Sequence, residues 1–528
     1  MTTPLHDVRH ADEDLPEGAV VDGDAIDDAI SDVFDVVIVG SGAAGAVAAH
    51  TFVEAGLSVG IVEEGPWVKT RDLSPDVHTV FSRALRAAGM QILHGRAFMP
   101  MLQGRCVGGS TLVNSAIAWR IPEDVVGEWS SRFGLGDDGK DDDAITMRDL
   151  EPCFDALERD LNVREVDDAV LGENNRLFVD QARRSGYVAA PMKRYDRGCK
   201  GSGFCITGCP NAAKQGMSVT YVPWALRRGA RIFTSCRVER VEMKGARATG
   251  VRARSASGHD VVVRARHAVV VAASTVQTPN LLRRSGVRAK ALGRHFQAHP
   301  GLAVSGLFDR PIQMSHGATQ GGESLHFRKT ERFKMETISL PPDLAGARIP
   351  GVGAELAERL AQLSHVAVWA AQVRAEAEGV VTPAWVGGDR VRYSMTKNDV
   401  GVARKAAATI ARMLFDAGAR EVWPSIYGLP TVLRSKDDVR LIEEGPLDSQ
   451  CYGFIATHLF GAARMGPDPK TSVVGRDFGV HGAEGLYVVD SSVFPTNLGV
   501  NPQHTIMAMS RLAALRLGRV LTSRRVAA

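Results

Sequence analysis

Residues 35–45 read Asp-Val-Val-Ile-Val-Gly-Ser-Gly-Ala-Ala-Gly. The apolar run over 36–39 is typical of a strand that is buried on both faces. The glycines that follow it, Gly40, Gly42 and Gly45, have the spacing G-x-G-x-x-G. In that pattern the first glycine allows a tight turn, the second lets a phosphate approach the backbone, and the third lets a helix pack closely on the strand. The stretch therefore predicts the first strand and turn of a dinucleotide-binding unit.

The residues after the glycines complete this unit. An Ala/Val-rich run predicts a helix over 43–54, whose free N–H groups and positive dipole end face the phosphates. A second strand is predicted over 58–62, and it ends at Glu63, whose carboxylate can accept hydrogen bonds from ribose hydroxyls. An ordinary glycine-rich turn is the alternative, but it does not explain the complete order of strand, turn, helix, strand and acid. By itself the unit leaves open whether the ligand is FAD or NAD(P).

The composition bounds the class of protein. The chain has 528 residues, 45% of them hydrophobic and 23% charged, as in an ordinary soluble globular protein of two large domains, or one with insertions. The formal net charge of +3 is spread along the chain, so nothing calls for nucleic acid as a partner. No apolar run reaches the length of about 18 residues that predicts a transmembrane helix, and the amino terminus lacks the pattern of a signal peptide. The expected location is the cytoplasm.

Residues 1–32 are rich in aspartate, and we predict that they form a mobile or loosely docked acidic arm. The remaining chain alternates helical and strand patterns. Strands are predicted over 231–241, 248–253, 260–265 and 267–272, helices over 78–90, 145–186, 400–418 and 501–520, and a strand-rich region over 300–395. Seven cysteines in a chain of this length do not make a disulfide scaffold.

Further motifs lie in the middle and at the end of the chain. The paired glycines Gly108 and Gly109, followed by Ser110, predict a second turn that approaches a phosphate. The apolar run over 486–489 predicts a buried strand that ends in Asp490, where ligands bind in open α/β sheets. The sequence Asn501-Pro-x-x-Thr opens the last helix, with the asparagine as a cap or a ligand contact.

Five blocks in this order resemble the glucose–methanol–choline (GMC) oxidoreductases, over nearly the whole chain from about residue 33. The blocks are residues 35–65, 108–114, 272–286, 458–466 and 490–505. The cholesterol-oxidase-like and long-chain-alcohol-oxidase branch is similar in its strand-end Asp490 followed by Gly-Val-Asn-Pro-x-x-Thr. The resemblance implies an α/β fold: an FAD-binding, Rossmann-like domain from segments 33–295 and 455–528, with a cap and cysteine-loop insertion over 121–216, and an α+β substrate-binding domain over 296–454 with a large antiparallel sheet.

The resemblance also implies the chemistry. FAD would be the cofactor, so that NAD has no role, with His458 as the general base that takes the hydroxyl proton of an alcohol and Asn501 orienting the alcohol oxygen, while the α-hydrogen passes as hydride to flavin N5. His504 is a rival for direct chemistry, and His299 is interpreted as structural. The implied cofactor-binding residues are Gly40, Gly42, Ala43, Ala44, Gly45, Glu63, Gly108, Gly109, Ser110, Asn114, Val238, Ala273, Asp490, Asn501, Pro502 and Thr505.

Three cysteines, Cys199, Cys205 and Cys209, lie in a glycine-rich loop with the spacing C-x5-C-x3-C-P. The flavin subunits of bacterial membrane-linked sugar dehydrogenases are similar here, and this resemblance implies a three-iron–four-sulfur cluster that carries electrons to an external acceptor. The alternatives are a zinc site, bare thiols or a disulfide. Those relatives reach the periplasm with a partner subunit that carries the export signal, so an acceptor protein or a small export subunit is a candidate partner.

The expected function is the oxidation of a primary or secondary alcohol, with O2 or an external acceptor receiving the electrons. Sugar, sterol, aryl and long-chain alcohols all stay open. Four aromatic residues of the substrate domain suggest a partly aromatic pocket, although aromatic side chains are equally ordinary in a core: Phe327, Trp369, Trp385 and Tyr452. The alternatives in other classes are a redox-silent lyase on the same scaffold and a flavin electron-transfer subunit without a substrate of its own.

Overall fold

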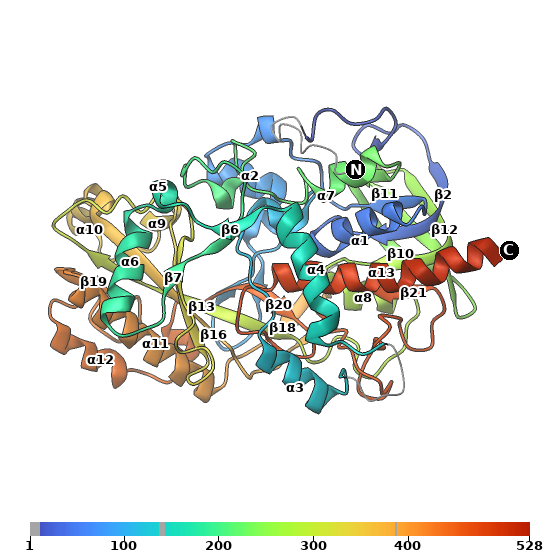
Figure 1. Ribbon diagram of the computed structural model, residues 1–528. Coiled ribbons are helices and arrows are strands. Elements are labelled where there is room, and N and C mark those ends of the chain that lie inside the picture. Colours follow the sequence, from blue (N-terminus) through green and yellow to red (C-terminus); the bar gives the residue numbers. More distant parts are fainter. Residues whose placement is uncertain (1–10, 137–142, 386–387, 528) are drawn as a thin grey trace.

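The computed structural model describes residues 11–136, 143–385 and 388–527. Two large sheets lie toward opposite ends of an elongated molecule (Figure 1). The first is eight-stranded and holds the predicted dinucleotide unit, and the second is seven-stranded and antiparallel. The predicted fold class is confirmed. No helix in the described ranges combines the length and the apolarity needed to cross a bilayer.

The first sheet has the predicted glycine turn near its centre. Its neighbours run in the order β1 (Val20–Asp22), β9 (Arg231–Thr234), β3 (Val59–Val62), β2 (Ile30–Val39), β12 (Asp260–Val271), β11 (Arg247–Ser255) and β10 (Cys236–Lys244), and β21 (Leu486–Val488) also pairs with β12. Strand β2 is parallel to both β3 and β12, as a strand buried on both faces requires. The two strands predicted over 260–272 are one strand, β12, with a register irregularity between Ala265 and Ala268.

The helix predicted over 43–54 is present with those bounds as α1 (Ala43–Glu54). It lies between the first sheet and the long last helix, α13 (Gln503–Ala527), which is drawn in red in Figure 1. Small residues permit this close packing: the hydroxyl of Ser510 on α13 reaches the carbonyl oxygen of Ala44 and donates to it at 2.7 Å. The helix that carries the last motif therefore packs close to the glycine turn of residues 40–45.

The acidic amino-terminal segment is not a loose arm over its described part. Strand β1 pairs in parallel with β9 at the edge of the first sheet. The side chain of Asp12 is buried, and its carboxylate accepts a hydrogen bond from the N–H of Thr70 at 2.8 Å. The prediction is wrong for residues 11–32, because backbone pairing and this buried carboxylate outweigh the polarity of the composition. Residues 1–10 lie outside the described residues.

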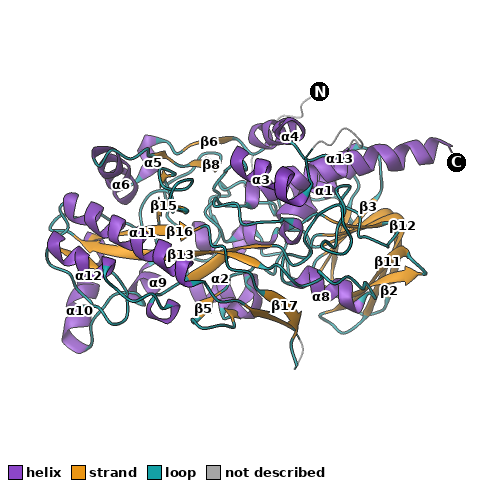
Figure 2. Ribbon diagram, turned by 90° about the horizontal axis from the view of Figure 1, so that it is seen from below, coloured by secondary structure: helices purple, strands orange, loops and turns teal. Residues whose placement is uncertain are grey.

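The second sheet forms one wall of the molecule's main cavity. Its strands run in the order β19 (Glu421–Trp423), β13 (Gln297–Leu307), β16 (Val366–Val373), β15 (Phe333–Thr337), β14 (Gly322–Ser324) and β7 (Ala190–Pro191), and β20 (Ile455–Phe460) also pairs with β13. Helix α11 (Lys397–Asp416) covers one face of β13 and β16 (Figure 2). The opposite face looks into the cavity. By its pairing, β20 joins this sheet, although the sequence groups it with the cofactor-binding segments.

The remaining elements surround these two sheets. Helix α2 (Val77–Ala84) ends earlier than the predicted helix over 78–90, and strand β6 (Val163–Glu165) interrupts the region predicted as helical over 145–186. The others are α3 (Glu123–Phe133), α4 (Met147–Asp160), α5 (Asp168–Leu171), α6 (Glu173–Arg184), α7 (Tyr221–Arg227), α8 (Gln277–Arg284), α9 (Pro342–Gly346), α10 (Gly353–Ala361), α12 (Val439–Glu443), β4 (Ile92–Leu93), β5 (Met99–Pro100), β8 (Lys193–Tyr195), β17 (Val380–Pro383) and β18 (Asp389–Arg392).

Candidate active site

Three glycines shape the turn between β2 and α1. Gly40 has a φ of +95°, and a Cβ there would lie 2.5 Å from the carbonyl oxygen of Ala272. At Gly45 an added Cβ would lie 1.9 Å from the carbonyl oxygen of Gly40, so α1 approaches the strand more closely than any other residue allows. Gly42 is the residue before α1, and its backbone faces Gly109 of the second glycine turn. The tight turn at Gly40 and the close helix packing at Gly45 are those that the spacing predicts.

The second glycine turn lies directly against the first. Gly108 and Gly109 have φ values of +86° and +54°, which glycine adopts without strain. A Cβ on Gly109 would lie 3.0 Å from the Cα of Gly42. The N–H of Gly108 donates to the hydroxyl of Ser41 at 3.2 Å, and the hydroxyl of Ser110 accepts from a backbone N–H at 2.9 Å. The two turns together present backbone to a narrow space that a phosphate chain can enter.

Glu63 follows β3 beneath the first turn. Its carboxylate accepts hydrogen bonds from the N–H and the hydroxyl of Ser41, at 2.9 and 2.7 Å, and from the N–H of Gly65 at 2.9 Å. Burial raises the pKa of Glu63, while these donors act in the opposite direction. Because a carboxylate has about four acceptor positions, about one remains for a ligand hydroxyl.

Asp490 joins the end of the β21 segment to the turn after β12. Its carboxylate accepts from the N–H of Ser274 at 3.0 Å, the hydroxyl of Thr278 at 2.6 Å and the N–H of Ser492 at 2.8 Å. Burial raises the pKa of Asp490. The neighbouring Ala273 lines the cavity together with this carboxylate. Asp490 thus fixes the relative position of two segments that are more than two hundred residues apart in the chain.

A cavity of about 630 Å³ runs from the glycine turns to the second sheet. Most of the predicted cofactor-binding residues line it: Gly40, Gly42, Ala43, Ala44, Glu63, Gly109, Ser110, Asn114, Val238, Ala273, Asp490, Asn501 and Pro502. Three predicted residues do not line this cavity as the described residues form it. Gly45 and Gly108 act through the backbone conformation, and the side chain of Thr505 is fully buried within the protein.

The two residues predicted to be catalytic both line this cavity and lie beside each other. His458 lies on β20, and its Nε2 is 3.4 Å from the amide nitrogen of Asn501. Burial, and then the positive charge of Lys334, lower the pKa of His458 to about 3, so the imidazole is neutral. A neutral imidazole can accept a proton from a hydroxyl group, and an amide can hold the hydroxyl oxygen.

His299, which the sequence suggests is structural, contacts His458 directly. The two Nδ1 atoms are 3.1 Å apart, and the ring centres are 5.3 Å apart. The register between β13 and β20 shifts between Ala298 and Pro300, and this irregularity brings the two imidazoles together. Burial lowers the pKa of His299 well below its usual value. Across this contact one nitrogen donates and the other accepts, so His299 restricts which nitrogen of His458 carries the proton.

A buried ion pair that the sequence motifs do not reveal lies beside Asn501. Lys334 on β15 is fully buried, and its Nζ donates to the Oδ1 of Asn501 at 2.5 Å. The same ammonium pairs with Glu336. The other carboxylate oxygen of Glu336 accepts from the amides of Gln320 and Gln372, at 2.7 and 2.6 Å. The alternation of Lys334 and Glu336 along one face of a strand is the signal that could have indicated a shared site.

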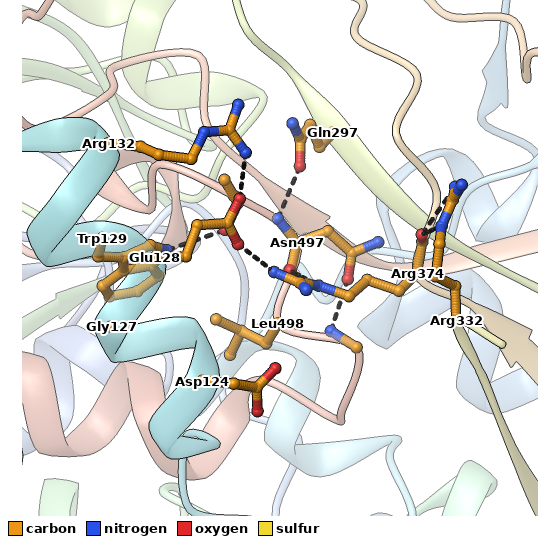
Figure 3. A network of polar contacts seen from close by, with 12 residues as sticks. Asp124, Gly127, Glu128, Trp129, Arg132, Gln297, Arg332, Arg374, Asn497 and Leu498 are labelled. Carbon is orange, nitrogen blue, oxygen red and sulfur yellow. Dashed lines mark hydrogen bonds and ion pairs between the residues drawn. The ribbon is translucent and has the colours of Figure 1, made fainter. Parts of the chain in front are cut away.

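The loop that carries Asn501 is held by an arginine from the second sheet. Arg374 follows β16, and its Nε donates to the carbonyl oxygen of Asn497 at 2.9 Å while its guanidinium pairs with Glu128 of α3 (Figure 3). The N–H of Asn497 donates to the side chain of Gln297 at 2.6 Å. Gly499 packs against the arginine side chain, where a Cβ would lie 2.9 Å from its Cδ. Asn501 is therefore presented from a loop that is anchored on two sides.

The cavity wall formed by the second sheet is polar beside His458 and Asn501, and it becomes aliphatic further along the strands. Beside His458 and Asn501, Gly301 of β13 lies opposite Gln372 of β16, which lies opposite Lys334 of β15. Two residues further along β16 is Ala370, followed on the same face by Val368 and Val366. Other apolar residues continue this wall: Leu302, Ala303, Met314, Ile338, Leu340, Leu344, Ile349 and Leu363.

Several expected residues lie elsewhere. His504 is buried in α13, with its Nε2 3.3 Å from the carboxylate of Glu158, and it does not line the cavity. Trp369 packs on Phe178 in the core that faces α11, and Trp385 is fully exposed. Phe327 and Tyr452 are likewise absent from the cavity wall as the described residues form it. Within the described residues, none of the four aromatic side chains named for the pocket lines the cavity, and Trp369 faces the helix-covered side because side chains alternate along β16.

The cysteine loop does not form a metal site. Within the described ranges, no group of three or more His, Cys, Asp or Glu side chains could hold a metal ion, so the predicted ligand set Cys199, Cys205 and Cys209 is not supported. All seven cysteines are free thiols. Cys205 instead contacts the guanidinium of buried Arg194 at 3.2 Å. Burial alone would raise the pKa of Cys205, but Arg194 and Lys214 outweigh it and lower this pKa to about 7.

Comparisons with known proteins agree with this geometry. Models of the GMC oxidoreductase family match residues 34–301 and 388–510. An uncharacterized GMC-type oxidoreductase of Mycobacterium tuberculosis is 35% identical over 96% of this chain and 79% of its own length. A long-chain-alcohol oxidase of Arabidopsis thaliana is 26% identical over 93% of this chain and 67% of its own length. The structure of the formate oxidase of Aspergillus oryzae, studied for its FAD modification, has a TM-score of 0.72 at 15% identity, over 95% of this chain and 100% of that chain.

The family models cover well over half of the chain, and they include both glycine turns and the segment that carries His458 and Asn501. The resemblance seen in the sequence motifs is thereby confirmed. The cavity fits a flavin dinucleotide, because the closely approaching backbones of the two glycine turns line it together with His458 and Asn501. The chain belongs to the GMC oxidoreductase family and is an FAD-dependent oxidoreductase.

Proposed function

We propose that this enzyme oxidises the hydroxyl group of a long, apolar primary alcohol to the carbonyl. The observation that carries the proposal is the aliphatic wall that leads away from His458 and Asn501 along one face of β16. An alcohol placed with its hydroxyl at the polar end of the cavity wall would lay its alkyl chain along this wall. Long-chain alcohols are also the substrates named for the Arabidopsis relative.

In this proposal His458 and Asn501 divide the work at the hydroxyl group. The Nε2 of His458 accepts the hydroxyl proton, and the Asn501 amide donates a hydrogen bond to the same oxygen as its negative charge grows. The neutral state of His458 supports its role as a base, because a protonated imidazole has no acceptor. When bound, FAD supplies the acceptor for the hydride that leaves the carbon.

We propose that the residues of the two glycine turns hold the pyrophosphate of FAD through backbone N–H groups. Glu63 would accept a hydrogen bond from the AMP ribose, since about one of its acceptor positions remains. The other residues that line the cavity would surround the flavin ring and its chain: Ser110, Asn114, Val238, Ala273, Asp490 and Pro502.

The length of the wall sets the expected length of the substrate. From Gln372 to Val366 the strand advances about 20 Å, at about 3.3 Å per residue. An extended alkyl chain advances about 1.25 Å per carbon, because its bonds of roughly 1.5 Å form a zigzag. The wall therefore matches an alcohol of about sixteen carbons, and a sugar would leave most of it without a partner.

The test is anaerobic bleaching of the flavin absorption by butanol, octanol, dodecanol, hexadecanol and glucose. Each buried methylene contributes about 0.8 kcal/mol, so kcat/KM is expected to rise about fourfold per carbon until the wall is filled. Replacing His458 by Gln should reduce the rate of bleaching by at least about a hundredfold with FAD still bound. Turnover with O2 and with an artificial acceptor then identifies where the electrons go.

A blocking variant gives the matched control. Ser305 lies opposite Val368, about 13 Å along the strand from Gly301 at about 3.3 Å per residue, and it lines the cavity. Ser305→Trp should abolish the reaction of hexadecanol and leave that of butanol unchanged. Equal rates for all chain lengths would reject the substrate class. Consumption of a cyanohydrin with the flavin still oxidised would instead favour the lyase.

A further inference from the structure

We infer that Lys334, held by Glu336, is a positioning residue that fixes the orientation of the Asn501 amide and keeps His458 in its proton-accepting form. The inference rests on the proposed function, in which these two residues contact the alcohol. Lys334 itself is not among the residues that line the cavity, so its effect passes through Asn501 and through its electric field.

The contacts of the ammonium group determine how the amide is turned. An ammonium group donates hydrogen bonds and has no acceptor, so the atom of Asn501 that lies 2.5 Å from Lys334 is the amide oxygen. The NH2 group of the amide must then face the Nε2 of His458, at 3.4 Å, and the cavity. Without the lysine, the two orientations of the amide are nearly equivalent, and one of them places an oxygen against the negative charge that develops on the alcohol.

Glu336 holds the lysine in place and is itself satisfied. Both partners are fully buried, and the carboxylate also accepts from Gln320 and Gln372. Removal of one partner of such a buried pair leaves the other charge uncompensated. The pair therefore places a fixed positive charge next to Asn501. The compensating negative charge, that of Glu336, lies two residues further along β15.

The same charge acts on the imidazole. If Nε2 of His458 accepts the hydroxyl proton, its Nδ1 carries a hydrogen and donates to Nδ1 of His299. A second proton on His458 before the alcohol arrives would meet the field of Lys334, which lowers the pKa of His458 after burial does. The charged side chains that act on the imidazoles are Lys334 of β15, which acts on both, and Arg374 after β16, which acts on His299. Glu323 of β14 interacts electrostatically with Lys334 and Glu336.

The test compares three variants by the pH dependence of anaerobic flavin reduction. Lys334→Met removes the positive charge and leaves a negative one, so the pKa of His458 rises from about 3 and an acid limb appears at a higher pH than in the wild type. Burial, the larger cause, still holds this pKa below the ordinary histidine value. The double variant Lys334→Met, Glu336→Gln removes both charges, so its limb appears at a lower pH than that of Lys334→Met. Glu336→Gln alone keeps the positive charge and shows no such limb. Both variants without the lysine should also lose about tenfold to a hundredfold in kcat, with less change in KM.

Nitrogen-15 NMR of the histidine rings, recorded on the holoenzyme without alcohol, gives a second readout. The signals of His458 are identified by their loss in His458→Gln. The pH at which they titrate should follow the same order among the variants as the acid limbs of the rate profiles. Lys334→Arg, which keeps the charge and the donors, should restore the wild-type profile. If the NMR titrations of His458 follow this order but the rates do not, His458 is not the base of the proposed function. The effect of the Lys334 charge on the pKa of His458 is then still confirmed.

One result would overturn the inference: an unchanged His458 titration and unchanged kcat in the double variant. That variant replaces a buried pair with neutral residues of similar volume, a change that folded proteins commonly tolerate. It therefore remains informative if Lys334→Met alone does not fold. The ratio of bound FAD to protein is measured for each variant, so that loss of cofactor is not mistaken for loss of positioning.

Discussion

The hydrogen atom that serves as the side chain of Gly45 allows α1 to lie against the end of β2. An added methyl group would lie 1.9 Å from a backbone oxygen, and backbone cannot move aside as the tip of a flexible side chain can. The whole phosphate end of the cavity depends on this approach, because α1 begins immediately after Gly42.

We therefore expect Gly45→Ala to destabilise the enzyme by at least about 2 kcal/mol and to release FAD. The thermal unfolding midpoint and the ratio of flavin to protein measure these effects. Gly127→Ala is the matched control, because it lies in a helix with no atom within 4 Å of the added methyl group, and it should stabilise by about 0.5–1 kcal/mol. Similar losses in both variants would contradict the steric argument.

Single residues also mark the limit of what the sequence reveals about the site. His458 and Asn501 stand in short motifs with local spacing, and their meeting at the cavity follows from the resemblance. Lys334 carries no such motif, and for His299 the motif Gly-Arg-His-Phe-Gln-Ala-His-Pro suggests only a structural role. Each reaches the site by a contact between residues far apart in the chain, 167 positions for Lys334 with Asn501 and 159 for His299 with His458. Pairings of that kind depend on strand register, which the local pattern leaves undetermined.

At the scale of elements, local sequence patterns predict the helices and strands whose conformation is determined by residues close by in the chain. The bounds of α1 follow from the glycine turn and the alanine run, and the structure has the same bounds. Strand β1 is missed because its three residues gain their conformation from pairing with β9, which follows more than two hundred residues later. For the cysteine loop the structure has bare thiols, one of the alternatives that the sequence leaves open, and the buried Arg194 that contacts Cys205 lies outside the motif.

A short 3-10 turn at Ser491–Val493 leads into the loop that precedes α13. The site depends most on this loop, and Arg374 is its anchor. Arg374→Ala removes the bond to Asn497 and the pair with Glu128, so we expect a loss of roughly 2 kcal/mol in stability and a lower kcat as Asn501 loses its fixed position. Thermal unfolding and the rate of flavin reduction check both parts.

Arg132→Ala is the control for this variant. Arg132 pairs with the same Glu128, but its side chain is 66% exposed, so its removal should cost less than about 0.5 kcal/mol and leave kcat unchanged. If the two variants behave alike, the anchoring of the loop contributes nothing beyond a surface ion pair.

For the molecule as a whole, a buried carboxyl group links stability to pH. Burial raises the pKa of Glu323 on β14 to about 8, with Lys334 opposing the shift. Between the ordinary carboxyl value of about 4.3 and this raised value, the folded state binds more protons than the unfolded state. The contribution of Glu323 to stability is therefore fully present below about pH 4 and is lost as the pH rises toward 8, by up to about 1.4 kcal/mol per unit.

We expect Glu323→Gln to raise the thermal unfolding midpoint at pH 9 relative to wild type, and to have little effect at pH 5. The exposed Glu444→Gln serves as the control and should leave the pH dependence of the midpoint as it is. An equal effect of Glu323→Gln at both pH values would show that the side chain acts through packing and not through its proton.

The position of β21 has a consequence for how the protein is made. The first sheet receives the strand at 486–488 beside β12, and the cavity is closed by residues that follow it. A chain emerging from the ribosome displays the glycine turn of residues 40–45 long before the segments that complete its surroundings have been synthesised. We therefore expect FAD to be captured only after residues 486–506 have been synthesised. Until then the edge of β12 over residues 269–271, which β21 later covers, is unpaired and open to association with other strands.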